Sequence, residues 1–339
     1  MKSPHSPILP VLRFPLSAFR FAILAALSLV TPAFAVVNID YVPVGSTGNA
    51  ADAATGHLYG AVAYAYQIAK NETTISQYAD FLNAVAKTDT YGLYSSKMPS
   101  GSINGITQSG GSGSFTYAVN PGSGNKPITH TSWFDAARFT NWMHNGQPVG
   151  LQTVGTTEGG AYTLNGATSG VSISKNVGAT VWIPSESEWY KAAYYDPNKG
   201  GAGVGGYWAQ ATQSNTISGN TIGVADSANY YDGDYAGFPG AALTDVGAYG
   251  VNSQSAYGTN DQAGNVWEWN DAVIGALRGL RGGSWGAGSG TLPASAGDKN
   301  TPTNQNDSFG FRVASVPEPS SLVLTLLTSG TLLLRRKRG

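Results

Sequence analysis

The chain of 339 residues contains no cysteine, few charged residues and only four histidines. The absence of cysteine excludes disulfide bonds, thiolate metal sites and a cysteine nucleophile. Charged residues make up 12% of the chain, about half of the usual share of roughly 25%. The net charge of −1 predicts no basic surface for nucleic acid or acidic lipid. Any chemistry must therefore use oxygen donors, a few imidazoles and scattered charges.

Glycine and aromatic residues are abundant instead. The chain has 45 glycines, near twice the usual frequency of about 7%. It also has 8 tryptophans and 18 tyrosines. This composition predicts a loop-rich globular protein, in which aromatic side chains supply the core and glycines allow tight turns.

Both ends of the chain carry sequence patterns typical of export and sorting. Residues 1–35 combine basic residues, an apolar run and the small-x-small sequence Ala33-Phe34-Ala35, as a signal peptide does. Residues 315–339 hold Val316-Pro317-Glu318-Pro319, an apolar run over 320–334 and a basic tail over 335–338. We expect the mature chain to begin near Val36.

The C-terminal pattern resembles the bacterial PEP-CTERM sorting signal. That resemblance implies an exosortase-type processing enzyme as a partner and an exported protein at the cell surface or in the extracellular matrix. The membrane would be contacted only through the C-terminal segment before processing. A plain transmembrane helix that anchors the protein is the alternative, although the apolar run is shorter than the roughly 20 residues that span a bilayer comfortably.

Between the two ends, helix-start signals predict three helices. Residues 36–60 are expected to hold a strand and a loop, and a strand over 61–70 leads into the rest of a domain that ends at residue 314. Loop or hairpin structure is expected over 91–124, with strand pairing near 114–119, and a hairpin insertion over 150–179. The three helices are predicted from the cap pairs Thr74 with Gln77, Ser132 with Asp135, and Ser185 with Glu188.

Glu186 and Glu188 have the spacing of an acid/base pair. Both carboxylates fall in the first turn of a predicted helix, where acids interact favourably with the helix dipole. We therefore interpret them as structural residues.

The stretch 257–285 contains the strongest pattern for a site. Asp261 and Glu268 lie on either side of a turn at Gly264. If the backbone folds back there, their carboxylates converge with the carbonyl oxygens of Gly264 and Val266. Oxygen ligands in a flexible loop suit calcium, which would be structural.

The same residues allow a second interpretation. Trp267 and Trp269 flank Glu268 and have the character of core aromatics. Glu268 would then be a buried partner for an arginine. The residues alone do not decide between an arginine partner and a calcium ligand.

Three motifs carry a resemblance to a known family, in chain order Gly264-Asn265-Val266-Trp267-Glu268-Trp269, Arg281-Gly282-Gly283-Ser284-Trp285 and Phe309-Gly310-Phe311-Arg312. They resemble the signature of the formylglycine-generating enzyme, or sulfatase-modifying factor, family, and the likeness extends over residues 61–314. It implies an α+β, C-type-lectin-like fold with short strands, a few helices and much irregular structure organised by calcium.

The resemblance also implies a second calcium site. An asparagine of the family that helps to hold this ion matches Asn229, and Tyr230 follows it. Asp232 or Asp234 could be the downstream partner, but their spacing departs from that of the family. A surface turn built on the asparagine is the alternative.

The family's catalytic cysteines have no counterpart here. Formylglycine-generating enzymes oxidise a sulfatase cysteine with two copper-binding cysteines that lie just after the glycine-glycine-serine-aromatic turn. This chain has Gly286-Ala287-Gly288-Ser289-Gly290-Thr291-Leu292 at that place. Small residues and hydroxyls cannot supply soft thiolates for copper. We therefore predict that formylglycine-generating activity is absent.

A related branch of the family uses iron held by histidines. His57, His130 and His144 are the histidines outside the predicted signal peptide. His130 and His144 would be separated by a helix of roughly 20 Å, so they are not expected to share a metal.

Two hypotheses follow for function. The first is a calcium-stabilised binding module at the cell surface or in the matrix, with a surface glycan or peptide as ligand. The alternative is an oxidoreductase or other enzyme of the same superfamily that uses a site without cysteine. The residues favour the module without deciding whether any catalysis remains.

Overall fold

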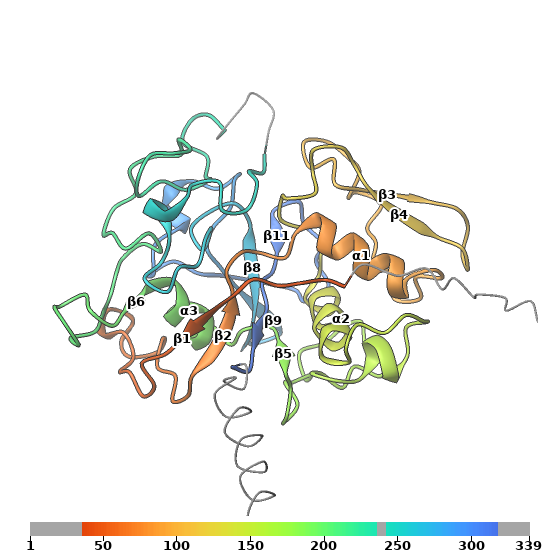
Figure 1. Cartoon of the computed structure of the whole chain (residues 1–339), viewed down its shortest axis with the longest axis horizontal. Coiled ribbons are helices and arrows are strands. Elements are labelled where there is room, and N and C mark those ends of the chain that lie inside the picture. The colour runs from red at the N-terminus through yellow and green to blue at the C-terminus, as the bar shows by residue number, and fades with distance from the viewer. Residues whose placement is uncertain (1–35, 236–241, 318–339) are drawn as a thin grey trace, which may run out of the picture. The chain divides into compact units, whose positions relative to one another are not determined.

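The computed structural model describes residues 36–235 and 242–317 (Figure 1). The expected signal peptide and residues 318–339 of the expected sorting segment lie outside these residues. Within them, no helix has both the length and the apolar character that a membrane span requires.

The fold is α+β with short strands and few helices, which confirms the fold class expected from the sequence. The helices are α1 (Ile75–Val85), α2 (Trp133–His144) and α3 (Glu186–Tyr194), with 3₁₀ turns at Ala53–Thr55, Val251–Ser253 and Ser289–Thr291 and a π turn at Val154–Glu158. The strands are β1 (Tyr41–Val44), β2 (Tyr66–Ala69), β3 (Ile106–Ser109), β4 (Thr116–Val119), β5 (Val181–Trp182), β6 (Tyr195–Asp196), β7 (Gly206–Tyr207), β8 (Trp267–Ile274), β9 (Leu277–Arg281), β10 (Asp298–Asn300), β11 (Phe309–Gly310) and β12 (Ala314–Ser315).

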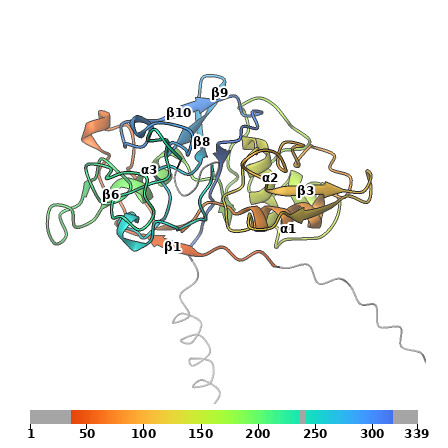
Figure 2. The ribbon, with the colours of Figure 1, turned by 90° about the horizontal axis from the view of Figure 1, so that it is seen from above.

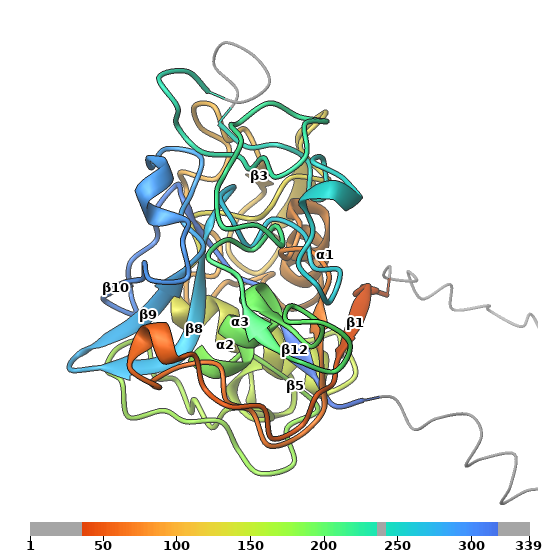
Figure 3. The same ribbon diagram turned by 90° about the vertical axis from the view of Figure 1, so that its left-hand side faces the viewer.

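Two four-stranded sheets form the framework. One has the order β1-β2-β12-β5 and the other the order β10-β9-β8-β11. All pairs in the first sheet are antiparallel, whereas β11 runs parallel to β8 in the second. Figures 2 and 3 both show α3 between β1 on one side and the β8–β9–β10 strands on the other. This helix therefore connects the two sheets.

Each α-helix begins with the cap that the sequence predicted. The Thr74 side chain accepts from the Gln77 amide, and the Gln77 side chain accepts from the Thr74 amide. Ser132 with Asp135 and Ser185 with Glu188 form the same reciprocal pair. A capping box satisfies backbone donors that the helix itself leaves free.

Helices α1 and α2 carry the aromatic core (Figure 1). Phe81 of α1 lies 5.4 Å from Phe139 and 5.2 Å from Trp142 of α2, measured between ring centroids. Phe311, from the last of the three motifs, lies 5.4 Å from Phe139. Aromatic contacts of this kind add to the free energy gained by burial. They fix the C-terminal motif against the helices.

The segment 150–179 differs from the expected hairpin. It holds the π turn and a single antiparallel bridge between Tyr162 and Lys175. A buried ion pair holds the segment against α2, since Arg138 donates to both carboxylate oxygens of Glu158, at 2.7 and 2.9 Å. A second difference is that the strand expected over 61–70 is confined to Tyr66–Ala69.

Candidate functional site

Strand β8 places Glu268 in the interior beside Arg312. Arg312 Nε donates to Glu268 Oε2 at 2.6 Å, and Arg312 Nη2 donates to Glu268 Oε1 at 2.6 Å. Trp189 Nε1 of α3 adds a third donor at 2.7 Å. Both charged side chains are fully buried. The structure therefore shows Glu268 as the arginine partner that was one of the two sequence interpretations.

The parallel pairing of β8 and β11 produces this contact. Gly310 lies opposite Glu268 in the register. Arg312 follows two residues later, on the same face as Gly310, because side chains alternate along an extended chain. A Cβ on Gly310 would lie 2.6 Å from the Ile128 carbonyl oxygen, so the close approach needs glycine.

Asp261 and Glu72 add two further acids around the same guanidinium. Asp261 Oδ2 accepts from the Gly247 amide at 2.6 Å. Both carboxylate oxygens of Glu72 are buried without a hydrogen-bond partner. Burial raises the pKa of Glu72 well above its ordinary value, and the nearby Asp261 raises it further. Burial likewise raises the pKa of Asp261. Three acids share one arginine, so a proton or a cation is needed to balance this cluster.

The turn at Gly264 joins the two regions for which the sequence suggested calcium. Gly264 has φ of +84° and forms an isolated parallel bridge with Asn229. The Asn265 amide donates to the Asn229 carbonyl oxygen at 2.8 Å. The structure thus brings Asn229 and Tyr230 beside Gly264 and Val266.

Asn229 has one oxygen that the protein does not satisfy. Its Nδ2 donates to Ala242 O at 3.1 Å and to Asn265 Oδ1 at 3.0 Å. Its Oδ1 is buried and has no partner. An unpaired amide oxygen in the interior is costly, so it fits a cation or a water molecule. The Tyr230 carbonyl oxygen, by contrast, accepts from Asn220 Nδ2 at 3.2 Å.

Only some of the predicted calcium ligands are therefore free to bind an ion. Asn229 Oδ1 is available for an ion, whereas both oxygens of Glu268 are already held by Arg312 and Trp189. Asp261 interacts with Glu72 and Arg312 as well as with Glu268. Across residues 36–235 and 242–317, no three His, Asp or Glu side chains converge as a metal site. Calcium at Asn229 would have to rely on backbone and amide oxygens.

Glu186 and Glu188, in the first turn of α3, bind different partners. Glu188 accepts from the Ser185 amide at 2.7 Å, from Trp182 Nε1 at 3.0 Å and from the Tyr64 hydroxyl at 2.7 Å. Glu186 instead forms an ion pair with Arg281 at 2.5 Å. These separate partners give each glutamate a structural role, as we interpreted them.

The histidines lie at opposite ends of an unbroken α2. His130 precedes the helix and is buried, with Nδ1 unpartnered. His144 ends it, and its Nδ1 lies 2.7 Å from Thr180 Oγ1. The helix between them keeps the two imidazoles from sharing one metal.

The turn after Trp285 contains no group suited to thiol-like chemistry. Thr291 Oγ1 donates to the Gly288 carbonyl oxygen at 2.8 Å, which closes the turn on itself. Leu292 is fully buried against the core formed by α3. Ser289 is exposed on the 3₁₀ turn.

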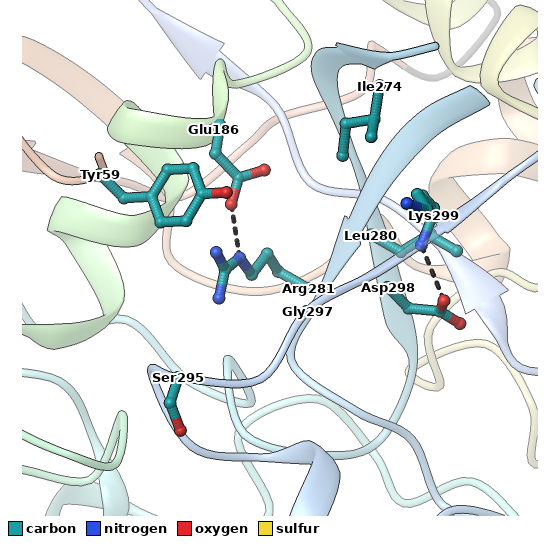
Figure 4. Close-up of a pocket in the computed structure, with 9 residues that line it drawn as sticks. All are labelled: Tyr59, Glu186, Ile274, Leu280, Arg281, Ser295, Gly297, Asp298 and Lys299. Carbon is teal, nitrogen blue, oxygen red and sulfur yellow. Dashed lines mark hydrogen bonds and ion pairs between the residues drawn. The ribbon is translucent and has the colours of Figure 1, made fainter. Parts of the chain in front are cut away.

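Two cavities adjoin on another part of the surface, and sequence reasoning missed both. The first has a volume of about 310 Å³ and is lined by residues that include Tyr59, Glu186, Arg281 and Lys299 (Figure 4). The second, of about 300 Å³, is lined by aromatic residues, and Ser295 contributes to both cavities. Arg281 belongs to the second of the three sequence motifs, but nothing local in the sequence connects it to Tyr59.

Comparisons with known proteins identify sequence relatives of the chain. The family described as "Sulfatase-modifying factor enzyme 1-like domain" matches residues 42–316. "Inactive C-alpha-formylglycine-generating enzyme 2" of Bos taurus is 26% identical over 216 residues, which cover 58% of this chain. The match spans 54% of that relative's length, about half of it.

Solved structures resemble the chain more distantly. The crystal structure of CarF is 21% identical, with a TM-score of 0.47, and the alignment covers 83% of this chain and 99% of CarF. Treponema denticola variable protein 1 is 17% identical, with a TM-score of 0.49 and coverage of 85% and 100%.

Proposed function

The chain belongs to the sulfatase-modifying factor family, and from that premise we propose that it is a binding module of the family without formylglycine-generating activity. The observation that carries the proposal is the complete absence of cysteine. The turn that follows Trp285 offers only small residues, hydroxyls and the buried Leu292 in place of thiols. Without thiolates, this turn cannot bind copper(I) as the family's oxidases do.

A relative that carries the word "inactive" in its name also supports the proposed absence of formylglycine-generating activity. The described part of the chain keeps the features that build the fold, including the buried Glu268–Arg312 pair and the capped helices. It also has two adjoining cavities of about 300 Å³ each, within the usual size range of ligand sites. A retained scaffold with open cavities suits binding of a surface glycan or peptide.

Calcium would serve this module as a structural ion. The unpaired Oδ1 of Asn229 supports an ion beside the Gly264 turn. There the carbonyl oxygens of Gly264 and Val266 are the backbone ligands to consider. The Tyr230 carbonyl oxygen already accepts from Asn220 and would have to bind the ion in addition. Asp261 would contribute charge, whereas Glu268 would act through Arg312 rather than as a direct ligand.

Export and sorting complete the proposal. The signal-peptide pattern over 1–35 and the PEP-CTERM-like pattern over 315–339 support delivery to the cell surface or the matrix, with processing by an exosortase-type enzyme. A comparison of the mass of the mature protein with that of the full chain tests this step. Loss of both end segments is expected, and a mature protein that keeps the basic tail would contradict it.

An activity assay tests the central claim. The purified full chain is incubated with copper and a peptide that contains a sulfatase cysteine, and aldehyde formation is followed by mass spectrometry. An active formylglycine-generating enzyme serves as the positive control. We expect no aldehyde, and catalytic aldehyde formation by this chain would overturn the proposal.

The metal content of the same preparation provides a second readout. Calcium without stoichiometric copper or iron agrees with a binding module. Stoichiometric copper or iron would instead support the enzyme alternative.

A further inference from the structure

The two cavities share Ser295 in their lining and differ in character. Figure 4 shows the polar cavity, with Tyr59, Glu186 and Arg281 on one side and Asp298 and Lys299 on the other. The second cavity is lined by the rings of Tyr190, Tyr207 and Trp208 together with Asp52, Asn215 and Pro293. Ser295 is exposed and lines both, so an extended ligand can cross from one cavity to the other.

A stacked guanidinium forms part of the wall of the polar cavity. Arg281 Cζ lies 4.9 Å from the ring centroid of Tyr59 and 5.1 Å from that of Tyr190. Its Nε is held by Glu186 and its Nη1 by the carbonyl oxygen of Ala294 at 2.9 Å. A Cβ on Gly297 would lie 3.2 Å from Arg281 Cζ, so glycine lets the loop cover this wall. The wall is therefore rigid before a ligand arrives.

The charges around the polar cavity balance. Arg281 and Lys299 are cationic, and Glu186 and Asp298 are anionic. Because the two signs cancel, the cavity has no excess charge to favour an anionic or a cationic ligand. Its carboxylates, hydroxyls and cations provide both acceptors and donors, as a ligand rich in hydroxyl groups requires.

In the aromatic cavity, the polar groups of the three aromatic side chains are already hydrogen-bonded within the protein. The Tyr190 hydroxyl donates to Asp52 Oδ2 at 2.7 Å, and the Tyr207 hydroxyl donates to the Ala50 carbonyl oxygen at 2.8 Å. Trp208 Nε1 donates to Asp196 Oδ2 at 3.1 Å. These bonds fix the rings, which reduces the entropy lost on binding. Tyr190 is buried, whereas Tyr207 and Trp208 are half-buried and expose part of their rings for apolar contact with the C–H face of a sugar. Lys199 Nζ lies 4.6 Å from the centroid of the Trp208 ring, so a sugar would pack on the part of Trp208 that this lysine leaves open.

On this basis we propose that the paired cavities bind a neutral oligosaccharide, with one sugar against Tyr207 and Trp208 and the next beyond Ser295 in the polar cavity. The inference rests on the proposed binding function and specifies its ligand class. A purely apolar ligand would make no use of the hydrogen-bond donors and acceptors of the polar cavity. A charged polysaccharide would gain no net electrostatic attraction, because the charges around the polar cavity balance.

The test uses the full chain and defined sugars. Cellohexaose, xylohexaose and mannohexaose are the neutral probes, hexagalacturonate is the anionic comparator, and binding is measured by saturation-transfer NMR and calorimetry. Ser295→Tyr places a bulky ring at the junction and is expected to weaken binding of a neutral hexasaccharide by at least about tenfold. Trp208→Leu removes a ring face and is expected to have a similar effect.

Ser112→Tyr is the matched control. Ser112 is exposed in the β3–β4 loop and lines neither cavity, so its variant is expected to bind as the wild type does. Melting curves of all three variants establish that they are folded. Binding that survives both Ser295→Tyr and Trp208→Leu would overturn the proposed location.

The remaining outcomes separate this inference from the proposed function. The ligand class would be overturned if no neutral hexasaccharide binds or if hexagalacturonate binds preferentially. A negative aldehyde assay would still support the proposed binding module in that case. Aldehyde formation would overturn the proposed function, whichever sugars bind.

Discussion

Arg312 and Glu268 form a two-point ion pair in which neither side chain reaches solvent. The pair links the last motif of the chain to strand β8, and Trp189 extends the contact to α3. An arginine fork on a carboxylate is directional as well as strong. The pair therefore fixes the orientation of three segments that come together only in the folded protein.

Glu268→Gln should destabilise the fold substantially. The variant removes the carboxylate that accepts two hydrogen bonds from Arg312 and leaves only Asp261 and Glu72 near the guanidinium. Breaking a buried ion pair typically costs about 3–5 kcal/mol. Urea unfolding should show this loss equally with calcium and with excess chelator, because Glu268 acts through Arg312. Asp298→Asn, an exposed acid on β10, is the control and should change the unfolding free energy by less than about 0.5 kcal/mol. A loss seen only with calcium would instead identify Glu268 as a direct ligand.

Calcium should raise the melting temperature through Asn229. An ion that binds only the folded state at a concentration a hundred times its Kd adds about 2.7 kcal/mol. Asn229→Ala should remove the difference between calcium and excess chelator, because Oδ1 is lost. Asn229→Asp should keep or enlarge that difference, since a carboxylate is a stronger calcium ligand. Differential scanning calorimetry measures all three proteins.

Asn83→Ala is the matched control for the calcium response. Asn83 is a partly buried asparagine whose side chain binds the Tyr117 backbone at 2.8 and 3.0 Å, away from the Gly264 turn. Its removal should lower the melting temperature while the calcium-dependent difference remains. A wild-type protein that melts identically with calcium and with chelator would exclude the structural ion.

The parts of the structure that the sequence predicted are local. Ser185 and Glu188 are three residues apart, and helix geometry alone brings the cap pair together. The long-range contacts required more information. Glu268 and Arg312 were recognisable as parts of motifs, but the sequence left open whether Glu268 binds calcium or an arginine. Only the register of β8 with β11 shows that the arginine is adjacent.

The cavities could not be predicted from any local pattern. Tyr59 lies in a loop without a motif, and Arg281 and Ser295 come from the far end of the chain. Their association depends on the way α3 lies between the two sheets. The expected hairpin over 150–179 was wrong for a related reason, since the Arg138–Glu158 pair holds that segment in place of a ladder.

Asp135 should make stability depend on pH in a specific direction. Burial raises the pKa of its carboxyl to about 6, above an ordinary value of 3.8. A raised acid contributes stability at low pH, and this contribution is lost as the pH rises from about 4 through about 6. Asp135→Asn should keep the hydrogen bonds from Ser132 and Gln305, all of which reach Oδ2.

Urea unfolding of the wild type and Asp135→Asn at several pH values between about 4 and 7 measures this effect. The stability of the variant relative to the wild type should increase across that window by up to about 3 kcal/mol. A difference that stays constant with pH would show that the Asp135 carboxyl titrates alike in the folded and unfolded states.

Gly264→Ala should be far more damaging than an ordinary substitution at a positive φ. A Cβ at Gly264 would lie 2.2 Å from the Asn229 carbonyl oxygen, so the backbone of one segment would have to move. Gly275→Ala is the matched control, because Gly275 also has a positive φ (+65°) but has open space around it. The control should lose about 1 kcal/mol from backbone strain, whereas Gly264→Ala should lose more than about 3 kcal/mol or fail to fold. Urea midpoints compare the two, and equal losses would show that the Asn229 backbone can move to accommodate the Cβ.

If Gly264→Ala folds, its calcium response provides a further check: displacement of Asn229 should weaken that response, while Gly275→Ala leaves it intact.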